Sequence, residues 1–132
     1  MKKTVMDSFA FLRFFFGESG AEIVKKILDE GKAGDRHLMM TACGWAEIKY
    51  MVLRKRGVAA WRAVLPFFDV VPVEVHPLDK DIADKAAELK SLHRLSLADA
   101  FAAELARREK AWLVTGDPEF KSVENLVRVI WI

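Results

Sequence analysis

Short apolar stretches that favour β-strands alternate with amphipathic stretches of helical period along the whole chain. Within one domain, this alternation is typical of parallel strands joined by crossover helices. We therefore expect an α/β domain with a mostly parallel sheet that carries helices on both faces. The expected strands cover residues 4–6, 38–40, 70–75, 112–115 and 127–130.

Capping residues and glycines indicate where the helices begin and end. Ser19 and Thr41 are placed to cap helices, and Gly57 closes the helix that Thr41 begins. Pro72 indicates that the strand containing it lies at an edge of the sheet, because proline cannot donate to a neighbouring strand. The expected helices cover about 8–16, 19–31, 41–56, 61–68, 79–89 and 96–105, with a helical turn from 117.

Length and composition limit the classes of protein to consider. The chain has 132 residues, enough for one domain over 1–132 with its own core. With 52% hydrophobic and 30% charged residues it does not belong to the disordered or collagen-like classes. A net charge of +2 excludes a protein that coats nucleic acid nonspecifically, so any nucleic-acid site must be local.

The sequence favours the cytoplasm over secretion or a membrane. Asp7 and Arg13 interrupt the apolar stretch near the N-terminus, which argues against a signal peptide. No apolar run approaches the ~20 residues of a membrane span. The single Cys43 excludes an intramolecular disulfide and a multi-thiolate metal site, which fits a reducing compartment, and we expect it to be a small buried side chain.

Four acidic residues stand where a ligand site is expected. Asp7 and Asp117 follow expected strands, and the carboxyl ends of parallel strands form the ligand crevice of such sheets. Asp99 and Glu47 lie in helical segments with small or apolar neighbours, which is unusual for solvated acids. These residues are the candidate site.

Each acid also has a structural interpretation. Asp7 and Asp117 are placed to cap helices, and Ser96 with Asp99 resembles a capping box. Glu47 would then be an ordinary exposed helix residue. If the four acids converge instead, two carboxylates about 4 Å apart repel by about 4 kcal/mol at an effective dielectric near 20. Such a cluster requires raised pKa values or a cation, and its all-oxygen ligands favour Mg²⁺ or Mn²⁺ over zinc.

Four motifs give the chain a resemblance to a known family. They are residues 5–8 (VMDS), 45–48 (WAEI), 96–100 (SLADA) and 113–120 (LVTGDPEF). Together they resemble the PIN domain, and most closely the VapC-type toxins of bacterial and archaeal toxin–antitoxin pairs. The resemblance covers nearly the whole chain.

The resemblance implies a metal-dependent endoribonuclease on a five-stranded parallel sheet, a homodimer that a cognate antitoxin silences. Asp7, Glu47, Asp99 and Asp117 would be its acidic quartet, which holds the metal and cuts RNA, and Thr115 and Ser8 would support it. Asp7 and Asp99 would be the primary ligands. PIN domains also serve in RNA processing without an antitoxin. A non-enzymatic α/β interaction module remains the third interpretation.

Basic and aromatic side chains suggest partner surfaces. Arg13 is a candidate phosphate contact, while residues 54–56 (RKR) and the basic side chains of 90–94 either flank an RNA groove or satisfy helix ends. The helix after Asp7 holds more aromatic surface than one face can bury, so we expect part of it to bind a dimer mate or the antitoxin. Its aromatic residues are Phe9, Phe11, Phe14, Phe15 and Phe16.

Overall fold

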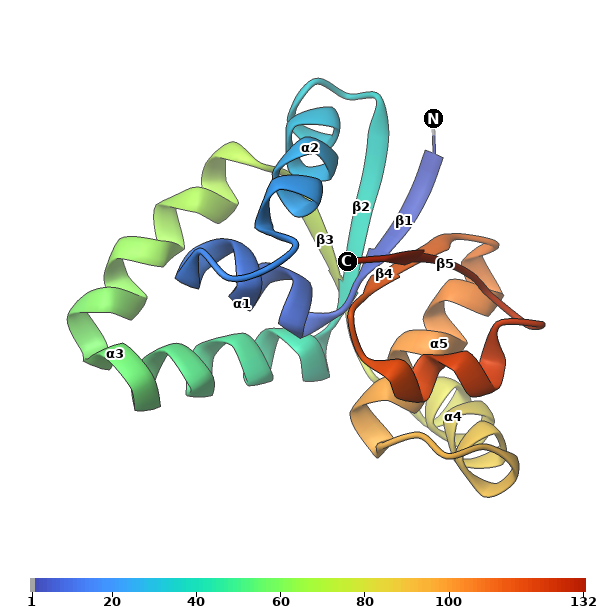
Figure 1. Ribbon diagram of the computed structural model, residues 1–132. Coiled ribbons are helices and arrows are strands. Elements are labelled where there is room, and N and C mark those ends of the chain that lie inside the picture. Colours follow the sequence, from blue (N-terminus) through green and yellow to red (C-terminus); the bar gives the residue numbers. More distant parts are fainter. Residues whose placement is uncertain (1) are drawn as a thin grey trace.

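A computed structural model describes residues 2–132 as a five-stranded sheet with helices on both faces (Figure 1). The strand order is β3-β2-β1-β4-β5, and every neighbouring pair is parallel. The expected α/β architecture is therefore confirmed. The elements are β1 (Lys2–Met6), α1 (Ser8–Phe16), α2 (Ala21–Lys32), β2 (Arg36–Thr41), α3 (Ala42–Val70), β3 (Val73–His76), α4 (Lys80–Leu92), α5 (Leu97–Glu109), β4 (Trp112–Thr115), the 3-10 helix η1 (Pro118–Val123) and β5 (Arg128–Trp131).

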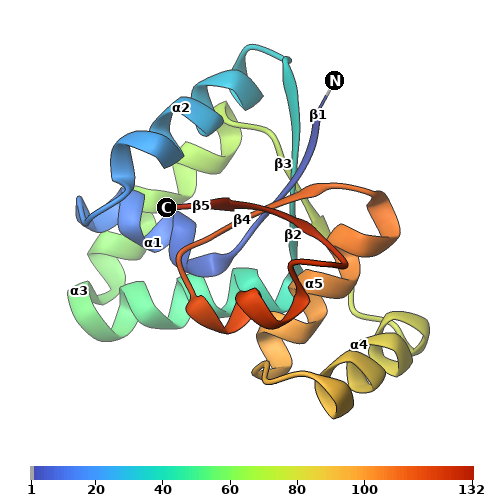
Figure 2. The same cartoon turned by 45° about the vertical axis from the view of Figure 1, so that its right-hand side comes forward.

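Successive side chains of the central strands point to opposite faces of the sheet and so divide the core into two halves. Val5 and Leu113 pack against α4, α5 and η1, whereas their neighbours Met6 and Val114 face α1, α2 and α3. Figures 1 and 2 show these two groups of helices on opposite sides of the sheet. Because β1 and β4 are covered on both faces where they cross the core, their residues 5–6 and 112–114 are apolar without alternation, as is usual for central parallel strands.

Helix α3 consists of two helical segments that meet at a kink at Gly57, so the expectation that Gly57 closes the helix begun by Thr41 is confirmed. Gly57 has φ 85° and ψ 179°, a conformation that glycine adopts readily because it has no Cβ. The bend turns the second half of α3 around α1 (Figure 1). Helical structure then continues past Pro66 to Val70, so β3 begins at Val73 rather than at residue 70.

The bend supplies partners for the aromatic side chains of α1. Phe14 and Phe15 lie 5.7 and 5.2 Å from the Phe67 ring, measured between ring centroids, and Phe11 lies 5.6 Å from Phe68. These contacts account for part of the aromatic surface of α1, because the kinked α3 packs against it, and Phe14, Phe15 and Phe16 remain half-buried. Phe9 is 41% exposed.

Two smaller expectations have different outcomes. Gly20, with φ 89°, is the N-cap of α2 in place of Ser19, because the chain reverses there and approaches Ile132 closely. Pro72 precedes β3, which is an edge strand as expected. Among the helices of residues 2–132, none has the length and apolarity needed to cross a bilayer.

Candidate functional site

The pairing of β1 with β4 brings two distant acidic segments together. Met6 lies opposite Val114 in the parallel register, so Asp7 and Thr115 leave the sheet side by side, with Asp117 two residues further on. The strand order also reverses here, since β2 and β3 lie beyond β1 while β5 lies beyond β4. Such a switch point is the usual ligand crevice of an open α/β sheet.

The Asp7 carboxylate is held inside this crevice. Asp7 is only 4% exposed, and the Thr115 hydroxyl donates a hydrogen bond of 2.8 Å to its Oδ2. Asp7 is the N-cap residue of α1, but its side chain makes no hydrogen bond of good capping geometry, and the Phe9 amide of its own helix makes only the smallest contribution to its pKa. The Asp7 carboxylate is held mainly by Thr115 of β4, so capping alone does not account for its position.

Glu47 joins the same network from α3. The Ser8 hydroxyl donates a hydrogen bond of 2.9 Å to Glu47 Oε1, and its oxygen also lies 3.4 Å from Asp7 Oδ1. Thr41 caps α3 by accepting from the Gly44 amide at 2.9 Å, which orients the first turns that carry Glu47. Glu47 is half-buried, so it is not the ordinary exposed residue of the structural interpretation; Cys43, expected to be buried, is also half-buried.

Asp99 and Asp117 complete the predicted set. Ser96 caps α5 by accepting from the Asp99 amide at 3.1 Å, while the Asp117 carboxylate accepts from the Glu119 amide at 2.9 Å. The capping interpretation is thus confirmed for Asp117 and for Ser96. The Ser96 amide donates to Glu119 Oε2 at 3.3 Å, which replaces the reciprocal bond of a capping box and leaves Asp99 directed at the acids.

The structure groups Asp99 and Asp117 with a third carboxylate, Glu119, that the sequence interpretation missed, whereas Asp7 and Glu47 lie outside this group and are linked to each other through Ser8. Carboxylate oxygens of Asp99, Asp117 and Glu119 all lie within 4.8 Å of one another. Glu119 is exposed and lies in the first turn of η1, so it does not directly follow a strand as Asp7 does. The available signal was its position two residues after Asp117 in a turn that begins with Asp-Pro.

Burial and mutual repulsion shift the protonation of this cluster. Burial raises the pKa of Asp7 to about 6, and the nearby charges of Glu47 and Asp117 add to the rise against the Thr115 hydrogen bond. Burial also raises the pKa of Asp99 to about 9, helped by a hydrogen bond with Asp117 and by the charges of Asp7 and Asp117. Without a cation, these side chains hold protons that ordinary aspartates lose.

The donor set fits a hard divalent cation. Every ligand atom offered by the cluster is a carboxylate oxygen, with the hydroxyls of Ser8 and Thr115 as supporting donors. The ion pairs among residues 2–132 involve none of the five acids, so no lysine or arginine of the described chain neutralises them by direct pairing. A bound cation would offset the repulsion that adds to the raised pKa values of Asp7 and Asp99.

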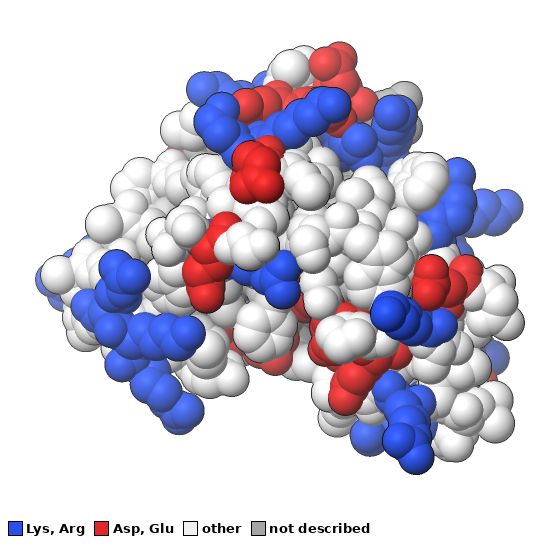
Figure 3. Space-filling view, viewed as in Figure 1, with Lys and Arg blue, Asp and Glu red and all other residues white. Residues whose placement is uncertain are grey.

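The two basic groups, residues 54–56 and the basic side chains of 90–94, make contacts within the protein that do not depend on RNA. Figure 3 shows basic side chains over the bend of α3, where Lys55 and Arg56 lie 5.3 and 5.0 Å from the Phe16 ring. Lys90 donates to the Leu95 carbonyl at 2.9 Å and so ties down the end of α4. These contacts favour structural roles for both groups. Arg13, in contrast, lines a hollow beside Asp117.

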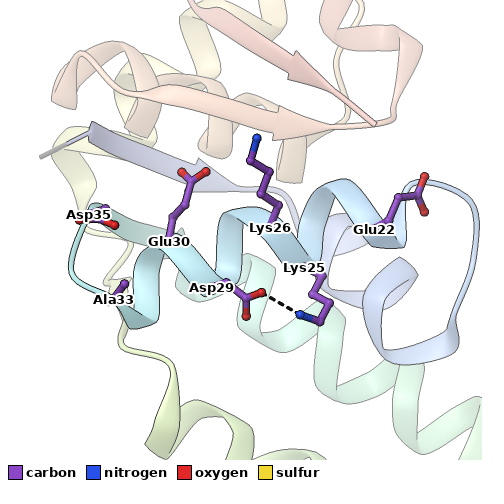
Figure 4. Close-up of a pocket in the computed structure, with 7 residues that line it drawn as sticks. All are labelled: Glu22, Lys25, Lys26, Asp29, Glu30, Ala33 and Asp35. Atoms are coloured by element: carbon purple, nitrogen blue, oxygen red, sulfur yellow. Dashed lines mark hydrogen bonds and ion pairs between the residues drawn. The ribbon is translucent and has the colours of Figure 1, made fainter.

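A larger hollow lies on the outer side of α2, away from the acidic crevice between β1 and β4 (Figure 4). Its volume is about 390 Å³. Lys25 and Asp29 form an exposed ion pair of 2.8 Å there, and both signs of charge alternate around it. Exposed pairs of this kind contribute little binding energy, and we assign no site to this surface.

The cluster predicts an unusual pH dependence for the metal-free protein. An aspartate in the unfolded chain titrates near 3.8, whereas Asp7 and Asp99 titrate near 6 and 9 in the folded chain. The folded state therefore binds more protons than the unfolded state in this window, and the free energy of unfolding falls as the pH rises from about 4 to about 9. Urea unfolding in EDTA at pH 5, 7 and 9 measures the fall.

The variant Asp99→Asn removes the group that contributes more to this fall in the free energy of unfolding. It should be more stable than the wild type above pH 7, by a margin that grows toward pH 9. Asp84→Asn, which changes an exposed acid on α4, serves as the matched control and should follow the wild type. An Asp99→Asn profile parallel to that of the wild type would contradict the assignment of Asp99 to the crowded cluster.

Solved structures with the same fold match almost the whole chain. The Rickettsia felis VapBC2 complex, bound to a DNA fragment from its promoter, superposes with a TM-score of 0.75 at 17% identity and 98% coverage of both chains. The Mycobacterium tuberculosis toxin VapC20, a Sarcin-Ricin loop cleaving toxin, gives 0.74 at 16% identity, covering 91% of this chain and 94% of that one. VapBC-5 from the same organism gives 0.65 at 23% identity and full coverage of both.

Sequence comparison agrees with the fold. No curated protein sequence matches the chain. A family model described as the PIN domain matches residues 4–126. This range includes the ends of β1 and β4 and all five acids described above. The chain therefore belongs to the PIN domain family.

Proposed function

We propose that this protein is a divalent-metal-dependent endoribonuclease of the toxin–antitoxin type. The observation that carries the proposal is the gathering of carboxylates at the crevice between β1 and β4: oxygens of Asp99, Asp117 and Glu119 lie within 4.8 Å of one another, and the buried Asp7 is close enough for its charge to raise the pKa of Asp99. Membership of the PIN domain family and the likeness to toxin structures, one of them a Sarcin-Ricin loop cleaving toxin, support it.

Mg²⁺ or Mn²⁺ is the cation that suits this site. Asp7 and Asp99 are the primary ligands in our proposal, because both are buried and directed into the crevice. Asp117 completes the set, and Glu119 adds a further carboxylate from the same turn. When bound, such an ion lowers the pKa of water and neutralises charge on the phosphodiester.

The chain's own side chains supply orientation and proton transfer. The Thr115 hydroxyl holds Asp7 Oδ2, and the main-chain amide of Asp117 donates to the Thr115 oxygen at 3.0 Å, so the threonine is itself fixed. The Ser8 hydroxyl donates to one oxygen of Glu47, and within residues 2–132 no group donates to the other. Glu47 would orient the attacking water and accept its proton.

The toxin assignment adds a protein partner. Toxin–antitoxin complexes are among the structures with this fold, including those from Klebsiella pneumoniae and Salmonella typhimurium. We place the antitoxin on α1 and α2, where the apolar side chains of Phe9 and Ile23 are exposed. An apolar helix bound there would lie near Asp7 and could direct a basic side chain at the acids. A homodimer in the cytoplasm is the expected form.

Two other functions remain distinguishable by experiment. A PIN nuclease of RNA processing would cut RNA without a co-encoded inhibitor. A non-enzymatic interaction module would show no saturable stabilisation by Mn²⁺, because a ligand stabilises only a protein that binds it. The cluster of unpaired acids favours either nuclease over the module.

The first functional prediction concerns the two primary acids. Asp7→Asn and Asp99→Asn should each lower RNA cleavage by about 100-fold or more, because each removes a charge that holds the cation and its water. Purified protein incubated with cellular RNA in Mg²⁺, Mn²⁺ or EDTA, followed by mapping of the cut ends, measures this. Asp84→Asn is the control for added amide and lost charge. Full activity in both cluster variants would refute the site.

Glu47 should behave differently from Asp99. Because Glu47 is held through Ser8 and lies at the side of the cluster, Glu47→Gln should lower turnover strongly but metal affinity less than Asp99→Asn does. Mn²⁺ titration followed by thermal unfolding gives the affinity, and single-turnover cleavage gives the rate. If Glu47→Gln weakens Mn²⁺ binding as much as Asp99→Asn, Glu47 is a primary ligand instead.

The antitoxin surface can be tested on the complex. A co-encoded partner bound to α1 and α2 should protect residues 8–30 from hydrogen exchange, because it covers their exposed side. Ile23→Ser should weaken the complex more than the fold, since that side chain is 40% exposed and contributes little to the core. Unchanged protection over 8–30 would place the partner elsewhere.

A further inference from the structure

A small hollow of different character opens beside the acidic cluster. It has a volume of about 260 Å³ and is lined by Phe9, Arg13, Gly116, Asp117 and Pro118. We propose that it binds the nucleotide next to the scissile phosphodiester of an RNA substrate, with Arg13 holding a phosphate and Phe9 stacking on the base. The inference rests on the proposed ribonuclease function and gives Phe9, Arg13 and Gly116 a part in it.

Arg13 is fixed at one end and open at the other. Its Nη1 donates to the main-chain oxygens of Ile132 at 3.1 Å and of Ser19 at 3.4 Å. Among the described residues, no other nitrogen of this guanidinium donates a hydrogen bond, so Nε and Nη2 keep their protons free. A planar guanidinium that is already oriented binds a phosphate with less loss of entropy than a free lysine would.

Gly116 allows the guanidinium to lie where it does. A Cβ atom at position 116 would lie 2.6 Å from Cζ, Nη1 and Nη2 of Arg13, which is closer than real contacts permit. The positive-φ glycines of the described chain are 17, 20, 34 and 57, so Gly116 is not required for its backbone angles. The reason for glycine here is close approach, which places a cation directly against the turn that carries Asp117.

Phe9 supplies an aromatic surface at the same hollow. It lies in the first turn of α1, two residues after Asp7, and is 41% exposed, whereas the other phenylalanines of α1 are buried or half-buried. Stacking on an aromatic side chain is the common way for proteins to hold an unpaired base, independent of its identity. A cation and an aromatic face within one hollow match the phosphate and the base of a single nucleotide.

A second basic hollow offers a matched control. It has a volume of about 600 Å³ and contains Trp112 and Arg128, whose guanidinium lies 4.4 Å from the Trp112 ring centroid. Both residues begin strands, so this hollow lies at the end of the sheet opposite the acids. It has the same pairing of arginine with an aromatic ring and no access to the cluster.

Binding of uncleaved RNA tests the proposal separately from catalysis. Fluorescence anisotropy of a labelled ten-nucleotide single-stranded RNA, measured in EDTA, gives Kd for the wild type and each variant. Phe9→Ala and Arg13→Gln should each raise Kd about 10-fold, as expected for the loss of one stacked base or one phosphate contact. Arg128→Gln should change Kd less than 2-fold.

A double-variant cycle separates binding from a merely structural role. Gly116→Ala should raise Kd by displacing Arg13, and it should have no further effect once Arg13→Gln is present, because the two act through the same group. Phe9→Ala removes an exposed side chain, so its effect does not depend on refolding of the core.

Each outcome bears on one proposal at a time. Wild-type Kd in Phe9→Ala and Arg13→Gln, an equal loss in Arg128→Gln, or no wild-type binding in EDTA overturns the nucleotide site and leaves the nuclease untouched. Localised binding without metal-dependent cleavage overturns the nuclease and leaves the nucleotide site. Additive effects of Gly116→Ala and Arg13→Gln overturn the role of Gly116.

Discussion

The parallel pairing of β1 with β4 is the contact on which the site depends. It joins two strands more than a hundred residues apart and sets the register in which Met6 faces Val114. Both strands are buried on both faces, so apolar packing against α1 on one side and α5 on the other holds that register. Asp7 and Thr115 then meet at the strand ends with a hydrogen bond of 2.8 Å. A slip of one residue would turn Asp7 away and separate it from Thr115.

The crowded acids lower the stability of the metal-free protein at neutral and higher pH. Burial and repulsion raise the pKa values of Asp7 and Asp99, which means that the ionised site is disfavoured in the folded chain. Hydroxyl groups partly offset this cost: Thr115 holds Asp7, and Ser8 holds Glu47. A divalent ion would offset much more of it. The same arrangement that makes the metal-free protein sensitive to pH therefore makes it a strong candidate for metal binding.

The bend at Gly57 decides which surfaces remain for partners. It folds the second half of α3 over α1, so Phe14 and Phe15 pack against Phe67. Phe9 remains 41% exposed at the start of α1, two residues after Asp7. Phe9 thus leaves exposed aromatic surface next to the acids. A substrate base and an inhibiting partner would both approach through this position, which offers a direct physical reason for inhibition by the partner.

Local sequence determined the class of fold, most helix ends and the four acids that follow strands or lie near helix starts. These signals act over a few residues and can be recognised without tertiary contacts: the spacing of apolar residues along the chain, the capping residues Thr41 and Ser96, and the Asp-Pro pair at 117. The tertiary structure alone decided how these parts meet. Glu119 lies near Asp99 because η1 turns back toward α5, and the Asp7 carboxylate is held by Thr115 of a strand more than a hundred residues away. Gly116 and Arg13 lie far apart in the chain, and nothing local indicates that one must be small for the other to fit. Contacts between distant segments depend on register and bending, which follow from the packing of the whole chain.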